Sequence, residues 1–310
     1  MSTAEPPQGA NLAPFGGSAA REPEGPPRGR AGTGEARASV DPPQAWGDHS
    51  SEERYAFARD VARRAGALAL DYFENRERLT IELKGPQDFV SHADRDVEAL
   101  LRREIARAFP GDRFLGEETA DAFAGPIDGC WVVDPIDGTH NFLRGVPYWN
   151  VAVAYVEQGG ARIGVVFDPA SGELYHAARG EGGWCDDASG TTRLHAASTQ
   201  QLAGAYVALG HHDRTPSARY LEIRRRMMER GVAMRNFGSA ALQLAHVARG
   251  RLDAFVELSL SWWDAVGGVL LVEESGGYAA PFAPAAATAK ASCIACAAGI
   301  ARELQALLKD

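Results

Sequence analysis

The sequence predicts a mixed fold in two closely packed halves, an α+β half over about 51–185 and an α/β half over about 186–310. Two helical segments with short apolar runs come first, and several short strands then follow one another between 149 and 184. Turns rich in glycine, aspartate and proline separate these strands, which is typical of an antiparallel meander. After residue 205, helical and strand-like segments alternate, which is typical of α/β architecture.

The first folded element is predicted at Ser50, because Ser50-Ser-Glu-Glu53 is a capping-box pattern and apolar residues then recur at helical spacing. A strand at 79–83, a helix over 92–108 and strands at 113–115 and 130–133 follow. The later elements are expected as strands at 151–156, 162–167, 173–177, 205–209, 252–256 and around Ile294, and as helices at 216–230, 239–248, 263–274 and 298–308.

Residues 1–50 differ in composition from the rest of the chain. They hold eight of the 17 prolines and eight of the 34 glycines, with few large apolar side chains. Such a segment buries too little surface to offset its chain entropy. We therefore expect a disordered Pro/Gly-rich tail ahead of the folded region over 51–310.

Composition and charge exclude several classes of protein. The 310 residues are 45% apolar and 24% charged, as in ordinary globular proteins, and the net charge of −9 argues against a nucleic-acid surface. No apolar run approaches the roughly 18 residues of a membrane helix, and we see no secretory signal pattern. The four cysteines are scattered, which favours a reducing, cytoplasmic location. Cys293 and Cys296 match half of a zinc motif, but their apolar surroundings predict thiols buried in a strand.

The segment Asp134-Pro-Ile-Asp-Gly-Thr139 follows the apolar strand Trp131-Val-Val. Proline and glycine end the strand at once, so two carboxylates project from a rigid turn. Hard oxygen ligands without histidine or cysteine favour Mg²⁺ over zinc. The amides of Gly138 and Thr139, which are predicted to lead into a helical turn, could bind phosphate oxygens. Since Asp-Pro and Asp-Gly are also ordinary turn sequences, the hexapeptide alone leaves a purely structural role open.

Three further carboxylates accompany this turn. Glu117 follows the strand at 113–115, Asp264 lies at the start of an apolar helix, and Asp94 lies three residues after Ser91 in a capping-box pattern. Each also has an ordinary interpretation, an exposed acidic helix start for Glu117 and a helix cap for the two aspartates. Taken one at a time, both interpretations stay open.

Taken together, these segments resemble the inositol monophosphatase family of Mg²⁺-dependent, Li⁺-inhibited phosphatases, over nearly all of 52–308. The matching segments, in order, are Val90-Ser-His-Ala-Asp94, Gly116-Glu-Glu118, Asp134–Thr139, Arg235-Asn-Phe-Gly-Ser-Ala-Ala241, Trp263-Asp264 and Leu271-Val-Glu-Glu-Ser-Gly-Gly277. The resemblance implies a layered αβαβα sandwich of the sugar-phosphatase type, so that 51–310 would form a phosphatase domain.

The resemblance also implies roles for individual residues, including two or three bound Mg²⁺ ions. The implied metal ligands are Glu117, Asp134 and the Ile136 carbonyl for the first ion, Asp134, Asp137 and Asp264 for the second, and Glu117 for a weaker third. Thr139 and Asp94 resemble the pair that orients the nucleophilic water, and Glu117 belongs to the same catalytic group. The implied substrate-binding residues are Gly138, Thr139, Gly238, Ser239, Ala240 and Glu257. For Glu257, an exposed position at a strand end is the alternative.

The implied reaction is hydrolysis of a small phosphorylated metabolite, with myo-inositol 1-phosphate the leading substrate. Histidinol phosphate is an alternative, because Asn141-Phe-Leu-Arg-Gly-Val-Pro147 also resembles that branch. An alternative of another class is a regulatory binding protein of the transcription or RNA-processing machinery. The resemblance further implies a homodimer, and it leaves His140 and the pair His211-His212 without an assigned role.

Overall fold

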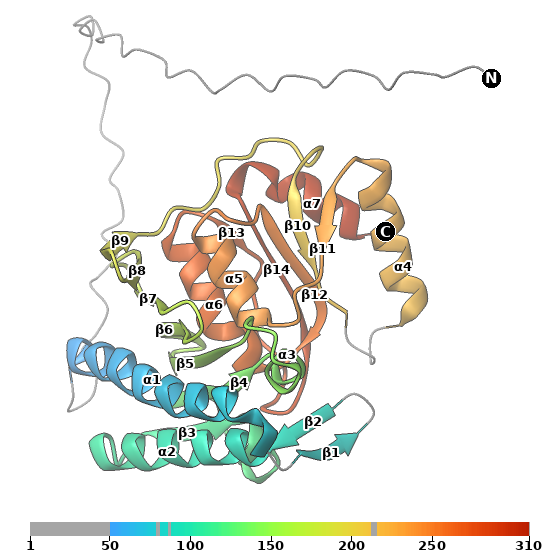
Figure 1. The fold of residues 1–310 in the computed structure, drawn as a ribbon. Coiled ribbons are helices and arrows are strands. Elements are labelled where there is room, and N and C mark those ends of the chain that lie inside the picture. The colour runs from blue at the N-terminus through green and yellow to red at the C-terminus, as the bar shows by residue number, and fades with distance from the viewer. Residues whose placement is uncertain (1–49, 79–80, 86–87, 212–215, 310) are drawn as a thin grey trace, which may run out of the picture. The chain divides into compact units, whose positions relative to one another are not determined.

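The computed structural model describes residues 50–309 apart from 79–80, 86–87 and 212–215, so the predicted tail lies outside the described residues except for Ser50. The α-helices are α1 Ser51–Glu74, α2 His92–Ala108, α3 Thr139–Arg144, α4 Ser217–Glu229, α5 Ala240–Ala248, α6 Trp262–Glu274 and α7 Ala301–Lys309 (Figure 1). Short 3₁₀ helices are η1 Arg76–Arg78, η2 Glu117–Ala122 and η3 Ala298–Ile300. None of the helices among these residues combines the length and apolarity that crossing a membrane would require.

The larger sheet has seven strands in the order β3-β4-β5-β6-β7-β8-β9. Their bounds are β3 Arg113–Gly116, β4 Cys130–Asp137, β5 Asn150–Glu157, β6 Gly160–Asp168, β7 Glu173–Ala178, β8 Gly183–Asp187 and β9 Gly190–Arg193. β3 runs parallel to β4, and every later neighbour is antiparallel, which confirms the predicted meander. The sequence did not predict β8 and β9, because their polar and glycine-rich residues carry little of the apolar alternation by which strands are recognised.

The second sheet has five strands in the order β11-β10-β12-β14-β13. Their bounds are β10 Tyr206–Leu209, β11 Ala233–Arg235, β12 Ala254–Leu260, β13 Tyr278–Ala279 and β14 Ala291–Cys296. β10 is parallel to both of its neighbours, whereas β14 is antiparallel to β12 and β13. A hairpin of β1 Ile81–Gly85 and β2 Asp88–Ser91 stands apart from both sheets.

Helices cover both faces of each sheet. α1 and α2 pack on one face of the seven-stranded sheet, and α5 and α6 lie between the two sheets (Figure 1). Side chains of α4 and α7 share a third apolar cluster with β10 and β12 on the far face of the five-stranded sheet. These layers, with apolar burial between each pair, confirm the predicted αβαβα sandwich.

Three of the helices begin with a capping box. These boxes are Ser50 with Glu53 at α1, Ser91 with Asp94 at α2, and Ser261 with Asp264 at α6. The box at α1 confirms the capping-box pattern predicted at Ser50–Glu53. The predicted final helix over 298–308 differs slightly, since it opens with the 3₁₀ turn η3 before α7 begins.

Candidate active site

The carboxyl end of β4 is a buried turn that carries two aspartates. Asp134 is 1% exposed and Asp137 is 7% exposed, and the pairing of β4 with β5 is irregular between them. Asp134 Oδ1 accepts a hydrogen bond from the Ile136 amide at 3.0 Å, and the Ile136 carbonyl accepts one from Thr139 Oγ1 at 3.0 Å. These two bonds hold the turn together internally, so its carboxylates keep a fixed position.

Gly138 lets the chain leave this turn and begin α3. Its φ is +95°, a conformation that L side chains rarely adopt. A Cβ there would also lie 3.1 Å from Ser239 Cβ and 3.2 Å from the Gly238 carbonyl oxygen. The glycine thus allows the β4 turn to approach the segment that starts α5, which agrees with the predicted helical turn after Gly138.

Asp137 accepts four hydrogen bonds from two other segments. Its Oδ2 accepts from Asn150 Nδ2 at 2.7 Å, from Ser239 Oγ at 2.8 Å and from the Ala241 amide at 2.8 Å. Its Oδ1 accepts from the Ala240 amide at 3.1 Å. Ser239 itself makes no side-chain capping bond, so Asp137 takes over the capping of α5 from a distant part of the sequence.

Asp94 and Asp264 are each the third residue of a helix that begins with a capping box. Asp94 Oδ2 accepts from Ser91 Oγ at 2.7 Å, and its Oδ1 approaches Thr139 Oγ1 to 3.5 Å. Asp264 Oδ2 accepts from the Ser261 amide at 2.7 Å. Both aspartates therefore cap a helix, as the ordinary interpretation predicts. Asp264 does so as the third residue of α6 and not as its N-cap. A cap uses one carboxylate oxygen and leaves the other for further contacts.

Glu117 begins η2 directly after β3 and is half-buried. The neighbouring turn is held by Glu98 of α2, which accepts from the Glu118 amide at 2.7 Å and from Thr119 Oγ1 at 2.6 Å. The alternative of an exposed acidic helix start is thus correct about the helix start, but Glu117 is not fully exposed.

These carboxylates influence one another's pKa values and therefore form one electrostatic group. Burial raises the pKa of Asp134 well above its usual value, and the charges of Glu117, Asp137, Asp264 and Asp94 raise it further. Burial and the Asp137 charge raise the pKa of Asp264 to about 7, whereas Lys290 acts in the opposite direction. Carboxylates that repel one another in a buried region are stable as anions only if cations neutralise them. We call the five carboxylates named here the β4 cluster.

The chemistry of the β4 cluster fits a hard divalent cation. Its side chains offer oxygen atoms only, and the Ile136 carbonyl keeps a second lone pair beside the one used by Thr139. Mg²⁺ prefers such carboxylate and carbonyl ligands, whereas zinc sites more often include cysteine or histidine. The residues present could therefore hold Mg²⁺.

The predicted substrate residues lie beside this cluster. Ser239 and Ala240 are buried at the start of α5, and Gly238 precedes them with a φ of +79°. Glu257 in β12 is 9% exposed, so the alternative of an exposed strand-end residue is wrong. Burial and the charges of Asp264 and Asp137 raise the pKa of Glu257 to about 8.

Gly210, just after β10, is what makes room for Glu257. A Cβ at Gly210 would lie 2.0 Å from Glu257 Oε2, so a larger residue there would displace the carboxylate. The histidines that the sequence left without a role lie on the surface at 140 and 211, and His212 lies outside the described residues.

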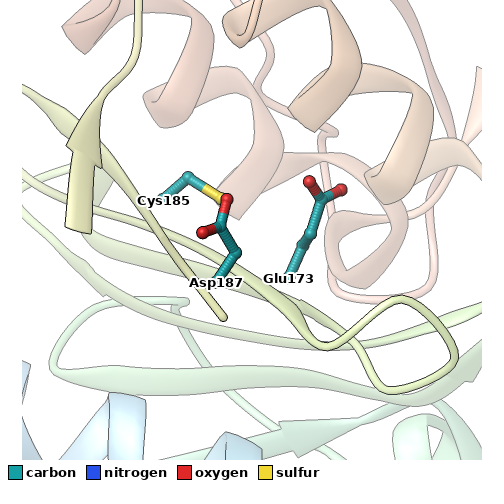
Figure 2. Close-up of side chains that lie close together, drawn as sticks. All are labelled: Glu173, Cys185 and Asp187. Carbon is teal, nitrogen blue, oxygen red and sulfur yellow. The ribbon is translucent and has the colours of Figure 1, made fainter. Parts of the chain in front are cut away.

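A second acidic cluster was not predicted from the sequence. Glu173 of β7 and Cys185 and Asp187 of β8 have side chains that lie close together (Figure 2). Their ligand-type atoms lie within 4.8 Å of one another. Within the described part of the chain, no three ligand-type atoms of the β4 cluster lie within this distance of one another. We call Glu173, Cys185 and Asp187 the β7–β8 cluster, and it could bind a metal on distance alone.

Two arginines after α5 already neutralise the β7–β8 cluster. Arg251 donates to both oxygens of Glu173 at 2.6 Å, and Arg249 donates to Asp187 at 3.2 Å and to the Cys185 sulfur. Burial raises the pKa of the Cys185 thiol to about 11, which keeps it protonated near neutral pH. Guanidinium groups thus supply the positive charge there, and no spacing in the sequence could have joined residues so far apart.

The fold and the β4 cluster agree with the comparisons with known proteins. A model of the inositol monophosphatase family matches residues 50–309, so the chain belongs to this family of phosphatases. The chain is 41% identical over 222 residues to the inositol-1-monophosphatase of Rhizobium meliloti (strain 1021), with 70% of this chain and 81% of the relative covered. It is 34% identical over 224 residues to the Nus factor SuhB of Escherichia coli (strain K12), with 72% and 82% covered.

A solved structure shares the whole architecture. The crystal structure of extragenic suppressor protein suhB from Bartonella henselae superposes with a TM-score of 0.74 at 33% sequence identity. The superposition covers 84% of this chain and 99% of that one. The predicted family and fold are therefore confirmed.

Proposed function

We propose that the protein is a magnesium-dependent phosphomonoesterase that hydrolyses myo-inositol 1-phosphate to inositol and phosphate. The observation that carries this proposal is the β4 cluster, in which burial and the charges of neighbouring carboxylates raise the pKa values of Asp134 and Asp264. Such a group attracts divalent cations. Membership of a phosphatase family, and the name of the Rhizobium meliloti relative, support the same activity.

The ligand assignment follows the carboxylates and the Ile136 carbonyl. We assign the first ion to Glu117, Asp134 and Ile136, and the second to Asp134, Asp137 and Asp264. A weaker third ion would also contact Glu117. Bound Mg²⁺ would supply an activated water and neutralise the charge of the phosphate and of the leaving oxygen.

The protein's own groups would then position the reactants. Thr139 Oγ1 donates to the Ile136 carbonyl, so its lone pairs remain able to accept a hydrogen bond from the attacking water. Asp94 Oδ1, 3.5 Å from that hydroxyl, is the nearby acceptor for the proton that the water gives up. The amides of Gly138 and Thr139 would bind phosphate oxygens.

The alcohol half of the substrate would lie against Gly238, Ser239, Ala240 and Glu257. A buried carboxyl group such as Glu257 can pair with sugar or inositol hydroxyls. Histidinol phosphate stays the second candidate, on the sequence of 141–147 alone. We also propose that the protein acts in the cytoplasm and as a homodimer.

A regulatory binding role is the second candidate function. The observation that favours it is the 34% identity to a relative named Nus factor SuhB. A binding role does not need the β4 cluster to hold cations, so the two functions separate experimentally.

The first experiment compares the wild-type protein with Asp134→Asn. Phosphate release from inositol 1-phosphate should require Mg²⁺, fall in millimolar-order Li⁺ and disappear in the variant, because a residue assigned to both proposed ions loses its charge. Activity that persists in chelator or in Asp134→Asn would refute the proposal.

A panel with histidinol phosphate, a 3′,5′-bisphosphonucleotide and fructose 1,6-bisphosphate identifies the substrate. Partners captured equally by wild-type and Asp134→Asn would favour the binding role.

A further inference from the structure

Asn150, the first residue of β5, contacts a proposed metal ligand from inside the protein. It is 0% exposed and lies opposite Asp137 in the register of β4 with β5. Its Nδ2 donates to Asp137 Oδ2 at 2.7 Å and to Ser239 Oγ at 2.9 Å. One buried amide group therefore joins the β4 turn to the start of α5.

The orientation of this amide is set by its neighbours. If it were turned over, Asn150 Oδ1 would face the Asp137 carboxylate, and two acceptors would oppose each other. In the orientation observed, Oδ1 is buried and has no hydrogen-bond partner among the described residues. An unpaired buried acceptor is unfavourable, because no hydrogen bond replaces the water that it loses on folding. The site therefore carries this amide as a donor at some expense to stability.

The donors are distributed unequally over the two oxygens of Asp137. Oδ2 accepts from Asn150, Ser239 and the Ala241 amide, whereas Oδ1 accepts, among the described residues, from the Ala240 amide only. An ionised carboxylate has about two lone-pair sites on each oxygen, so Oδ2 is saturated and Oδ1 keeps a site. The rotation of the carboxylate about its last bond is fixed by the same four bonds.

We propose that Asn150 is a positioning residue that fixes the Asp137 carboxylate by Oδ2 and so leaves Oδ1 as the oxygen that binds a divalent cation. The proposal rests on the proposed function for the role of Asp137 as a metal ligand. Residues that hold a ligating carboxylate from behind typically contribute about 10- to 100-fold to metal affinity. The contribution comes from holding the ligand in place, since Asn150 brings no charge of its own.

The test measures cation binding directly, without substrate. Metal-stripped wild-type protein and Asn150→Ala are titrated with Mn²⁺, and the free ion is followed by electron paramagnetic resonance. We expect affinity to fall about 10- to 100-fold in Asn150→Ala. Ser239→Ala, which removes a second donor to the same oxygen, should act in the same direction. If Asn150→Ala does not refold after stripping, Asn150→Ser provides the same comparison.

The matched control is Ser171→Ala. Ser171 Oγ donates to Oδ2 of the buried Asp168 at 2.7 Å, so the control removes an equivalent bond to a carboxylate outside the β4 cluster. Its Mn²⁺ affinity should equal that of wild type. The melting temperatures of the metal-free proteins are recorded in parallel. A lower melting temperature in Asn150→Ala with unchanged Mn²⁺ affinity would show a purely structural role and overturn the proposal.

The outcomes separate this proposal from the proposed function. Wild-type protein that binds Mn²⁺ but hydrolyses no phosphate monoester would refute the phosphatase and leave the role of Asn150 standing, provided that Asn150→Ala binds weakly. An active, magnesium-dependent wild-type enzyme whose Asn150→Ala variant binds Mn²⁺ normally would refute only the role of Asn150. Wild-type protein that binds no divalent cation would refute both.

Discussion

The β4 cluster and the β7–β8 cluster both contain buried carboxylates, yet they differ in how their charge is neutralised. Asp137 of β4 accepts a hydrogen bond from an amide at the start of α5. Glu173 instead pairs with the guanidinium of Arg251, which follows the end of the same helix. Burial alone would raise the pKa of Glu173, but hydrogen bonds from Arg251 and Tyr175 hold it below its usual value. In the β4 cluster the pKa of Asp134 is raised by burial and by its neighbours.

This difference in charge neutralisation distinguishes the two acidic clusters better than distance does. The atoms of the β7–β8 cluster lie within 4.8 Å of one another, but guanidinium groups already satisfy them. The carboxylates of the β4 cluster are less tightly grouped and remain mutually repulsive. Repulsion between buried carboxylates is costly to stability, and strongly shifted pKa values of this kind are typical of ligand-binding positions.

The largest difference between the clusters is expected in catalysis. Asp264→Asn should lower kcat for the proposed phosphatase reaction about 10³-fold, because a proposed metal ligand that would stabilise charge by several kcal/mol is lost. Glu173→Gln should leave kcat within about twofold of wild type. Both are measured by phosphate release at saturating Mg²⁺. Equal losses in the two variants would remove the functional distinction between the clusters.

Stability should depend on pH in the direction that the β4 cluster sets. The pKa of Asp264 rises from 3.8 to about 7 and that of Glu257 from 4.5 to about 8, mainly by burial. Below the ordinary pKa values, which apply to the unfolded chain, both carboxyl groups are protonated in the folded and in the unfolded protein. As the pH rises from these values through the raised pKa values of the folded protein, the free energy of unfolding decreases. The melting temperature of metal-free protein should therefore fall between about pH 4 and pH 8, on the order of 5–10 °C.

Mg²⁺ should reverse this loss, because it binds the ionised carboxylates of the folded state. Thermal unfolding is followed by circular dichroism with and without Mg²⁺ at pH 5 and pH 8. The stabilisation by Mg²⁺ should be larger at pH 8. A stabilisation that is equal at the two pH values would contradict the charge repulsion assigned to the β4 cluster.

Much of the fold could be predicted from the sequence because its signals are local. The capping boxes of α1 and α2 are patterns within four residues, and the strands β5 and β6 are apolar runs bounded by turn residues. The polar strands β8 and β9 carry no such signal, since they are held by pairing to β7 and to each other. Burial of Cys293 and Cys296 in β14 was also predicted, and the structure confirms it.

The residues of the candidate site could be named in advance only through their ordered motifs and the resemblance that these carry. Local patterns alone left Asp94 and Asp264 as helix caps, which they also are. Asn150 was missed, because its contact with Asp137 depends on the irregular register of two strands. The pairing of Glu173 with Arg251 was missed for a related reason, as 78 residues separate the partners.

The smallest of the expected effects concerns the arginines that neutralise the β7–β8 cluster. Arg251→Met removes both bonds to Glu173 and keeps much of the side-chain volume, so it leaves a largely buried carboxylate without its main partner. Because the Arg251 side chain is 41% exposed, water screens part of the loss. We expect the free energy of unfolding to fall by about 1–2 kcal/mol, measured by urea denaturation at pH 7.

Arg225→Met is the matched control for that prediction. Arg225 on α4 pairs with Glu222 and Glu229, and all three side chains are about a third or more exposed. Its loss should leave the free energy of unfolding close to the wild-type value, because water screens ion pairs between exposed side chains. The Mg²⁺ concentration for half-maximal activity should stay at the wild-type value in both variants. A shifted Mg²⁺ requirement in Arg251→Met would show that the β7–β8 cluster is coupled to the proposed metal site. Neutralisation by arginine would then no longer distinguish the β7–β8 cluster from the β4 cluster.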